Sequence, residues 1–400
     1  MGNQELLKKL STVNESKIVL VVADGLGGLP KEDGKTELEA AKTPNLDDLA
    51  ARSICGLMNP ILPGITPGSG PAHLSLFGYD PLRYEIGRGI LEVLGAGLSP
   101  GPKDLAARGN FATINTDGVI IDRRAGRITT EKNRELCQLL DGIEIEGVKV
   151  TVAPVKEHRF AAIFQGEDLY DELTDSDPQK IGLEPLPVLP LVKETERTAQ
   201  IINRFIDEAK RRLSEHYPAN MVLFRGFAKN IQLPTFQELY QLNPSCIATY
   251  PMYRGLARLL GMELLPTGET LEAQIETLKE YFKDYDFFYL HFKRPDSKGE
   301  DGDFEGKVKD LEELDKYIPS VVELNPEVLV VTGDHSTPAK LKSHSWHPVP
   351  VLLWSKFCRQ DQVTTFGETA CIQGGLGRFS AIHLMPLMLA NAQKLKKFGA

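Results

Sequence analysis

Three acidic residues follow short runs of β-branched and aromatic residues, and their carboxylates are the first candidates for chemistry. Asp24, Asp296 and Asp334 come after apolar runs that start at residues 17, 286 and 327. Runs of this composition predict buried strands. The carboxyl ends of parallel strands meet at one edge of a sheet, so we expect the three carboxylates to lie close together. A cluster of this kind suits a divalent metal ion.

Histidines stand near the third of these acids. His335 directly follows Asp334, and His344 and His347 come shortly before an apolar run at residues 349–354. A carboxylate beside an imidazole suits Mn²⁺ or Zn²⁺. The alternatives are a hydrogen-bonded turn at Asp334 and His335, and two solvated loop histidines further on.

Ser69 is the candidate nucleophile. It lies in a Gly- and Pro-rich stretch, residues 64–78, that starts as a tight turn and then becomes apolar with helical spacing. The stretch places Ser69 near a helix N-terminus, where backbone N–H groups favour an anion such as phosphate. A serine hydroxyl needs a base or a metal to become a good nucleophile. The alternative is a simple helix cap.

The elements that must position these residues form an alternating pattern. Helical patterns over residues 195–214, 270–283 and 304–317 lie among the strand-like runs, which predicts an α/β fold with a doubly wound, mainly parallel sheet. Short alternating strands broken by Gly, Pro and Asp turns follow residue 104. We therefore expect a core over residues 1–104 and 186–400 and an inserted, smaller α+β cap over residues 105–185.

Composition limits the function classes. At 400 residues the chain is long enough for two domains, and its net charge of −9 argues against non-specific nucleic-acid binding. Five scattered cysteines, none in a CxxC spacing, fit a reducing compartment. No apolar stretch reaches the roughly 20 residues needed to span a bilayer, and no signal sequence precedes the first strand. We expect a cytoplasmic protein, and the oligomeric state stays open.

Seven ordered motifs resemble those of the archaeal-type cofactor-independent phosphoglycerate mutases, which belong to the alkaline phosphatase superfamily. The likeness covers nearly the whole chain and includes Gly374 to Arg378 near the C-terminus. The motifs are VADG at 22–25, TPNLD at 43–47, GSGPAHLSLFGYDP at 68–81, GRG at 87–89, DSKGEDG at 296–302, GDHSTP at 333–338 and HSWHPVP at 344–350.

The resemblance implies two divalent metal ions. It implies that one ion is held by Asp24, Ser69, Asp334 and His335, and the other by Asp296, His344 and the residue four after Asp296. The superfamily typically has histidine at that last position, but this chain has Glu300. A carboxylate there shifts the preference toward Mn²⁺ or Mg²⁺, although Co²⁺ and Zn²⁺ remain open. Asp301, Asp303 and His291 are the alternative ligands.

The resemblance also implies an activity. Ser69 would take the phosphoryl group from 3-phosphoglycerate and return it to the other hydroxyl, giving 2-phosphoglycerate in glycolysis and gluconeogenesis through a phosphoserine enzyme, without 2,3-bisphosphoglycerate. The implied substrate contacts are Asp122, Arg123, Arg127, Arg225 and Arg254, of which the first three lie in a run that alone reads as a solvated basic turn.

Two other functions remain open from the sequence. The first is a metal-dependent phosphatase or phosphonate hydrolase of the same superfamily, which would release its product instead of retaining it. The second is an inactive relative that binds phosphorylated metabolites as a sensor, with Glu300 as a mark of decay.

Overall fold

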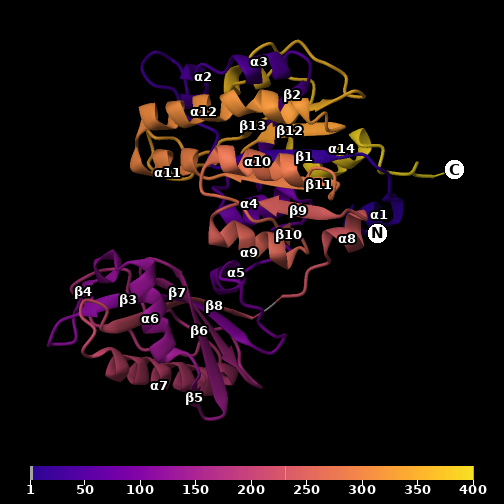
Figure 1. The fold of residues 1–400 in the computed structure, drawn as a ribbon. Helices are drawn as coiled ribbons and strands as arrows, with labels where there is room; N and C mark the ends of the chain where they lie inside the picture. The colour runs from indigo at the N-terminus through magenta and orange to yellow at the C-terminus, as the bar shows by residue number, and fades with distance from the viewer. Residues whose placement is uncertain (1–2, 230, 400) are drawn as a thin grey trace. The chain divides into compact units, whose positions relative to one another are not determined.

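The computed structural model describes residues 3–229 and 231–399 (Figure 1). The chain forms two compact units, each built from separate stretches of sequence. Unit 1 comprises Met1–Glu85, Pro234–Tyr250 and Leu260–Ala400, and unit 2 comprises Ile86–Leu233 and Pro251–Leu259.

Unit 1 is built on an eight-stranded sheet. All its strands run parallel except β13, which is antiparallel to both neighbours. This arrangement confirms the predicted α/β class with a large, mainly parallel sheet. In spatial order the strands are β10 (Glu263–Leu264), β9 (Pro244–Ile247), β11 (Phe287–Phe292), β1 (Ile18–Ala23), β12 (Val328–Thr332), β13 (Val349–Ser355), β2 (Ile54–Asn59) and β14 (Gly377–Ser380).

The three strands that carry the acids are neighbours, because β1 pairs in parallel with β11 on one side and β12 on the other. All three strands are buried along their whole length. Strands covered on both faces read as continuous apolar runs, which is why the sequence marked them clearly. Their carboxyl ends emerge at one edge, as predicted.

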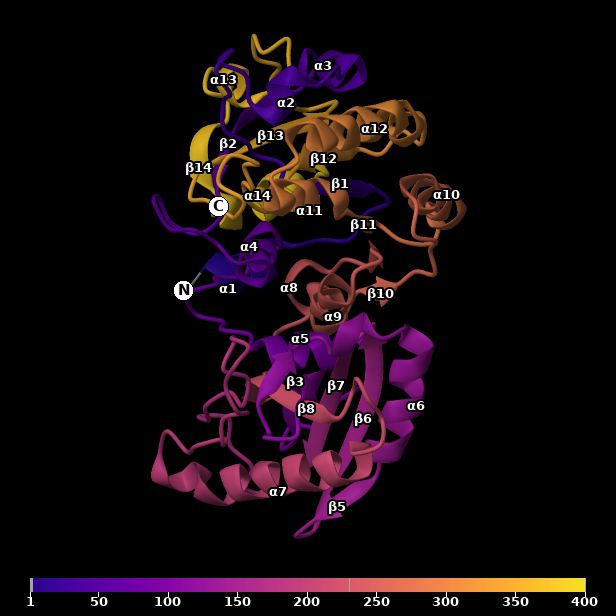
Figure 2. The same ribbon diagram turned by 90° about the vertical axis from the view of Figure 1, so that its left-hand side faces the viewer.

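Helices cover both faces of this sheet. On one face, side chains of β1 and β11 share a core with α3, α10 and α12, while on the other face Tyr289 packs against His73 and Phe77 at α4. Figure 2 shows α10 and α12 to the right of these strands and α4 to the left. The helices of unit 1 are α1 (Asn3–Leu10), α2 (Glu37–Ala40), α3 (Pro44–Ala50), α4 (Ser69–Leu76), α8 (Phe236–Tyr240), α10 (Leu271–Tyr281), α11 (Arg294–Asp301), α12 (Phe304–Glu323), α13 (Glu368–Cys371) and α14 (Leu384–Asn391), with a 3₁₀ turn at Ala381–His383.

One predicted element near the acids was wrong. We expected the run that starts at residue 286 to continue as a strand to Asp296, but β11 ends at Phe292 and α11 begins at Arg294. Pro295 occupies the first turn of α11, where its fixed φ favours a helix and its missing N–H costs nothing. No described helix of either unit is long and apolar enough to cross a membrane.

Unit 2 contains a second, smaller sheet with its own core. Aromatic side chains from β3, β7, β8 and α7 pack at the centre of that core. The strand order is β4 (Ile120–Asp122), β3 (Leu105–Ile114), β7 (Arg159–Gln165), β6 (Val148–Lys156) and β5 (Ile143–Ile145), and β8 (Met221–Lys229) pairs with β3. Its helices are α5 (Arg88–Gly95), α6 (Thr130–Leu140), α7 (Glu196–Leu213) and α9 (Pro251–Leu259), with 3₁₀ turns at Ala125–Arg127 and Lys193–Thr195.

Unit 2 extends beyond residues 105–185 on both sides. Strand β8 pairs with β3 over most of its length, and α5 packs against the same strands. These contacts join residues 86–104 and 186–233 to the small sheet. The assignment of residues 105–185 as an inserted cap stays a prediction.

We predict that Leu290→Ala lowers the free energy of unfolding by about 2–5 kcal/mol, because Leu290 is fully buried between β1 and β9 and its loss leaves a cavity. Urea denaturation followed by circular dichroism measures the change. The matched control is Leu82→Ala, where the leucine is 63% exposed and the expected change is below about 0.5 kcal/mol. Equal effects at both positions would contradict this account of the core.

Candidate metal centre

Asp24 is the first residue after β1 and is completely buried. The Lys293 ammonium lies 2.9 Å from Asp24 Oδ2, and His291 Nε2 lies 3.1 Å from the same oxygen. Burial alone would raise the pKa of Asp24, but Lys293 and His291 hold it well below its usual value. Asp24 therefore remains an anion inside the protein.

Asp334 and His335 follow β12 and lie beside Asp24. His335 Nε2 is 3.2 Å from Asp334 Oδ2 and 3.4 Å from Asp24 Oδ1. The three residues are buried, and each offers a ligand atom within 4.8 Å of the other two. We call Asp24, Asp334 and His335 the first ligand group.

Asp296, His335 and His344 form the second ligand group, defined by the same 4.8 Å limit. The rings of His335 and His344 stack with centroids 3.7 Å apart. His344 Nδ1–H donates to the Pro67 carbonyl at 2.9 Å, and its Nε2 lies 3.5 Å from Asp296 Oδ1. Burial would lower the pKa of His344, but Asp296 and the Pro67 carbonyl raise it to about 9. His335 thus belongs to both groups, whereas the sequence assigned it to one metal.

Ser69 is the first residue of α4, and Gly68 is its N-cap. Its Oγ lies 3.2 Å from His335 Nε2, which brings the hydroxyl to both ligand groups. The side chain is partly exposed, unlike the buried acids behind it. His73, one turn along α4, lies with Nδ1 2.9 Å from the Ser69 carbonyl oxygen and 3.2 Å from Asp334 Oδ2. His73 therefore contacts both the Ser69 backbone and the Asp334 carboxylate.

Glu300 lies at the rim of the second ligand group. It is one helical turn after Asp296 on α11, so both carboxylates are on one helix face. Glu300 Oε1 is 3.8 Å from His344 Nε2, and its side chain is 57% exposed. Burial of the carboxyl group, followed by the charge of Asp296, raises the pKa of Glu300. Glu300 is not a member of either ligand group, although its carboxylate lies beside His344 of the second group.

The three alternative ligands to Glu300 have other surroundings. Asp303 caps α12 by accepting from Gly306 N at 2.9 Å and pairs with Lys298. Asp301 is exposed at the end of α11. His291 contacts Asp24 as described above. Among the four acidic and imidazole candidates, Glu300 is the one placed against His344.

The sequence analysis missed two residues of this centre. Lys293 Nζ bridges Asp24 and Asp296, at 2.9 and 2.5 Å. Burial lowers the pKa of Lys293, but the two carboxylates raise it above its usual value. Thr337 Oγ1 lies 2.6 Å from Asp296 Oδ1 and 2.9 Å from His335 Nδ1. The available signal was proximity in sequence, since Lys293 precedes Asp296 by three residues and Thr337 follows His335 by two.

The predicted substrate contacts all lie in unit 2, and several already have partners there. Asp122 accepts hydrogen bonds from the backbone N–H groups of Arg124 and Gly126, at 2.8 and 2.7 Å. Arg123 forms a two-bond pair with Asp177, at 2.8 and 2.6 Å. The sequence did not reveal this pair, because 54 residues separate its members.

Arg225 lies within β8, which continues to Lys229. Its Nε is 3.5 Å from Asp175 Oδ2. Arg108 on β3 is directly opposite Arg225 in the ladder and is a further cation that the sequence analysis missed. Arg127 is the exposed last residue of the 3₁₀ turn Ala125–Arg127, and Arg254 lies on α9.

Several arginines surround His158 in unit 2. Burial, followed by the charges of Arg159, Arg124, Arg108 and Arg127, lowers the pKa of His158 to about 4. The imidazole is 4% exposed. Although the whole chain is acidic, this part of unit 2 has the local positive charge that an anion requires.

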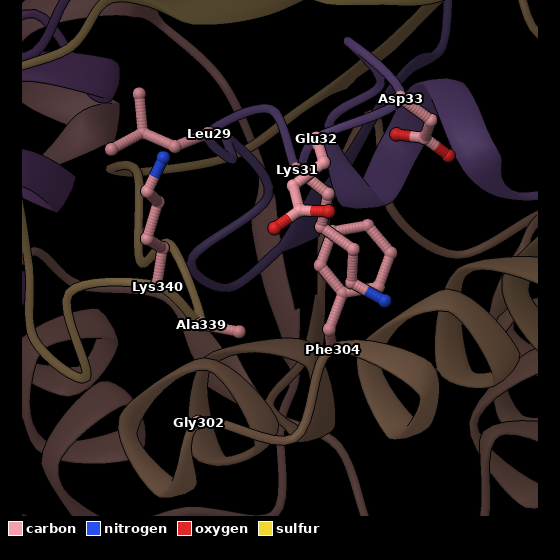
Figure 3. A pocket seen from close by; sticks show the side chains of 8 residues that line it. All are labelled: Leu29, Lys31, Glu32, Asp33, Gly302, Phe304, Ala339 and Lys340. Atoms are coloured by element: carbon pink, nitrogen blue, oxygen red, sulfur yellow. The ribbon is translucent and has the colours of Figure 1, made fainter.

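A cavity of about 640 Å³ in unit 1 contains none of the predicted site residues (Figure 3). The Lys31 ammonium lies 3.6 Å from the centre of the Phe304 ring on its wall and pairs with Glu305. Leu29 and Ala339 also line the cavity. In the sequence, they lie a few residues after Asp24 and His335. The cavity and the metal centre are therefore distinct features.

The two ligand groups fit divalent cations on chemical grounds. They bring three buried carboxylates and two imidazoles together, and that mixture of oxygen and nitrogen suits Mn²⁺ or Zn²⁺ better than the all-oxygen sites of Ca²⁺. The Nδ1–H of His344 is fixed by a backbone carbonyl, which leaves Nε2 toward the second group.

Comparisons with known proteins agree on one family. The sequence model described as "2,3-bisphosphoglycerate-independent phosphoglycerate mutase" matches residues 50–220. A protein of Thermotoga maritima named "Probable 2,3-bisphosphoglycerate-independent phosphoglycerate mutase" is 54% identical over 400 residues, covering 99% of each chain.

Two solved structures resemble the whole chain. A protein of Pyrococcus horikoshii has a TM-score of 0.85 and 29% identity, with coverage of 97% of this chain and 100% of the other. The cofactor-independent phosphoglycerate mutase of Thermoplasma acidophilum has a TM-score of 0.73 and 34% identity, with coverage of 94% and 100%.

We predict that Glu300→Ala weakens Mn²⁺ binding at the second ligand group, because it removes a carboxylate that lies 3.8 Å from His344 Nε2. Glu300→His should retain two ions and shift the preference toward Zn²⁺ or Co²⁺, since it replaces oxygen with nitrogen. Isothermal titration and metal analysis of the metal-stripped protein measure both effects. The matched control is Glu305→Ala, which removes an exposed carboxylate that belongs to neither ligand group. If Glu300→Ala binds two ions as tightly as the control, Glu300 is not a ligand.

Proposed function

Because the chain belongs to the family of 2,3-bisphosphoglycerate-independent phosphoglycerate mutases, we propose that it interconverts 3-phosphoglycerate and 2-phosphoglycerate through a phosphorylated Ser69. The supporting observation is the position of the Ser69 hydroxyl, which is partly exposed at a helix N-terminus and 3.2 Å from His335 Nε2. That imidazole is shared by two groups of metal-ligand side chains. The reaction needs no added 2,3-bisphosphoglycerate.

Ser69 acts as the nucleophile in this proposal. Its Oγ attacks phosphorus, the bond from phosphorus to the substrate oxygen breaks, and the glycerate hydroxyl leaves with a proton. The first N–H groups of α4 have no acceptor within the helix, so they favour the negative charge of the phosphoryl group. In the second half, the other glycerate hydroxyl attacks phosphoserine and Ser69 is regenerated.

Two divalent cations, with Mn²⁺ preferred over Mg²⁺, Co²⁺ or Zn²⁺, would neutralise charge on the phosphoryl oxygens and lower the pKa of the Ser69 hydroxyl. We assign Asp24, Ser69, Asp334 and His335 to one cation. We assign Asp296, Glu300 and His344 to the other. Because His335 is a member of both ligand groups, the two groups are close enough for a pair of neighbouring ions.

Lys293 is an addition to the set proposed from the sequence. Its ammonium contacts the Asp24 and Asp296 carboxylates, which belong to different ligand groups. It therefore lowers the repulsion between two buried anions that the fold holds close together. This position also allows the ammonium to bind an oxygen of the phosphoryl group.

The glycerate contacts remain Asp122, Arg123, Arg127, Arg225 and Arg254, and the segment 105–185 remains the proposed substrate-binding cap. The arginines that lower the pKa of His158 support an anion site in unit 2. Arg123 is held in a fixed orientation by Asp177, which takes its Nε and one N–H of Nη2, and by the Gln179 carbonyl, so a substrate contact at Arg123 would use the remaining N–H groups. Excluding water while glycerate reorients would separate a mutase from a phosphatase.

We predict that Ser69→Ala abolishes the interconversion while leaving the fold intact, because it removes the nucleophilic oxygen from a partly exposed helix start. An enolase-coupled assay measures 2-phosphoglycerate, and a parallel assay measures free phosphate. Ser343→Ala, an exposed serine shortly before His344, is the matched control. Near-normal turnover of Ser69→Ala would exclude the serine mechanism. Phosphate as the main product of the unmodified protein would favour the alternative, a phosphatase or phosphonate hydrolase of the same superfamily.

We predict that Arg127→Ala lowers kcat/KM for 3-phosphoglycerate. The expected loss of transition-state stabilisation is about 2–4 kcal/mol, the range for a lost charge-assisted contact to a bound anion. Steady-state kinetics of the same coupled assay give the value. Arg124→Ala is the matched control, since it removes an exposed arginine from the same run. If the two variants lose activity equally or not at all, the glycerate site lies elsewhere.

A further inference from the structure

We propose that Thr337 is a positioning residue that joins the two ligand groups and sets their geometry together. The inference rests on the proposed function, because it concerns how the same centre binds its cations. Thr337 is completely buried and lies two residues after His335. Its hydroxyl contacts two members of the second group, Asp296 and His335, and His335 is also a member of the first group.

The direction of these hydrogen bonds follows from the chemistry of the partners. An ionised carboxylate can only accept, so the Thr337 hydroxyl donates its single proton to Asp296 Oδ1 at 2.6 Å. The Lys293 ammonium lies 2.5 Å from the other oxygen of this carboxylate, which is the environment of an anion. The Thr337 oxygen must then accept from His335 Nδ1–H, at 2.9 Å.

This arrangement fixes the tautomer of His335. With the proton on Nδ1, the lone pair of Nε2 is available for a metal ion. Nε2 is the atom that lies 3.2 Å from Ser69 Oγ and 3.4 Å from Asp24 Oδ1. One hydroxyl therefore presents the His335 ligand atom and orients the Asp296 carboxylate at the same time.

The backbone of Thr337 is held from two directions. Its N–H donates to the Gly27 carbonyl at 3.0 Å. The buried ammonium of Lys307 on α12 donates to the Gly27 and Thr337 carbonyl oxygens, both at 2.9 Å. These bonds tie the loop after β12 to the loop after β1. These hydrogen bonds fix the backbone from which the Thr337 hydroxyl extends, as a positioning role requires.

Two glutamates, the buried Glu37 and the half-buried Glu368, extend this support. Glu37 accepts from the backbone N–H groups of Leu29 and Ala339, at 3.2 and 2.7 Å. Glu368 accepts from Gly28 N at 2.8 Å and from the Thr36 hydroxyl at 2.7 Å. Both carboxylates oppose the loss of charge that burial favours at the Lys307 ammonium. The loops around Thr337 are thus cross-linked by charged groups that are not themselves metal ligands.

Glycine makes this close packing possible. A Cβ at Gly25, whose φ is +66°, would lie 2.6 Å from Thr337 Oγ1 and 2.9 Å from the Asp296 Cβ. A Cβ at Gly299 would lie 2.1 Å from the Thr337 carbonyl oxygen. All three distances are shorter than real Cβ atoms show. The space around Thr337 is therefore filled to the point where its hydroxyl cannot move far.

The test compares Thr337→Val with Thr337→Ser. Valine keeps the branched shape and loses the hydroxyl, whereas serine keeps the hydroxyl and loses a methyl group. Isothermal titration of the metal-stripped full chain with Mn²⁺ gives affinity and stoichiometry for each. We expect Thr337→Val to weaken Mn²⁺ binding about 10- to 100-fold, the usual effect of removing a partner of a metal ligand, and Thr337→Ser to stay within about threefold of the unmodified protein.

The Mn²⁺ affinities of the two variants, compared with their stabilities, distinguish a positioning role of Thr337 from a packing role. Thermal unfolding of the metal-free variants reports packing, for which valine should be the better substitute. If Thr337→Val binds Mn²⁺ as tightly as the unmodified protein, or if Thr337→Ser is as weak as Thr337→Val, the inference is overturned. Should Thr337→Val fail to fold, Thr337→Ala replaces it against Thr337→Ser, with the same two criteria.

The same experiments distinguish this inference from the proposed function. Failure of the unmodified protein to bind Mn²⁺ or to interconvert the phosphoglycerates overturns the proposed function. Normal binding and turnover in the unmodified protein, together with unchanged Mn²⁺ affinity in Thr337→Val, overturns the role of Thr337 alone.

Discussion

The burial of three carboxylates at one edge of a sheet is the constraint on which the rest of unit 1 depends. Asp24, Asp296 and Asp334 are each no more than 1% exposed. Desolvation and mutual repulsion both oppose three anions in one buried place. The surrounding structure offsets that cost with Lys293 and with imidazoles on several sides. A site that gathers negative charge in this way is suited to hold cations.

The fold meets this constraint with adjacent parallel strands. Strand β1 lies between β11 and β12, so the loops after all three strands meet without any long excursion. The loops after β1 and β12 are then joined by backbone hydrogen bonds and by the Lys307 ammonium. Ser69 approaches from a different element, the start of α4, and its hydroxyl stands in front of the buried acids. The groups that support the acids and the accessible serine hydroxyl therefore come from different residues.

The sequence predicted the parts of this centre that obey local rules. Asp24 and Asp334 were predictable because an apolar run followed by an acid marks the carboxyl end of a buried parallel strand. Asp296 was predicted as a candidate but placed on the wrong element, since Pro295 starts a helix where we expected a strand to continue. The unit boundaries were harder, because β8 joins the small sheet from more than 100 residues away along the chain.

The residues that the sequence missed act through distant partners. Lys293 owes its role to Asp24, and Thr337 owes its role to Asp296, which is 41 residues away. From the sequence alone, Arg123 lies in a run interpreted as a solvated turn, but in the structure it pairs with Asp177. Motif resemblance carries ligand types from one protein to another, but it does not reveal which polar side chains orient those ligands. Such contacts depend on three-dimensional packing.

The central claim is that the phosphoryl group passes through Ser69, and trapping that intermediate tests it most directly. The protein would be loaded with Mn²⁺, mixed with 3-phosphoglycerate and quenched in acid, and the peptide that contains Ser69 would be analysed by mass spectrometry. The account predicts phosphate on Ser69 in the reacting sample and none in a sample stripped of metal. Turnover at a normal rate with phosphate never detected on Ser69, or with phosphate on a different residue, would contradict it.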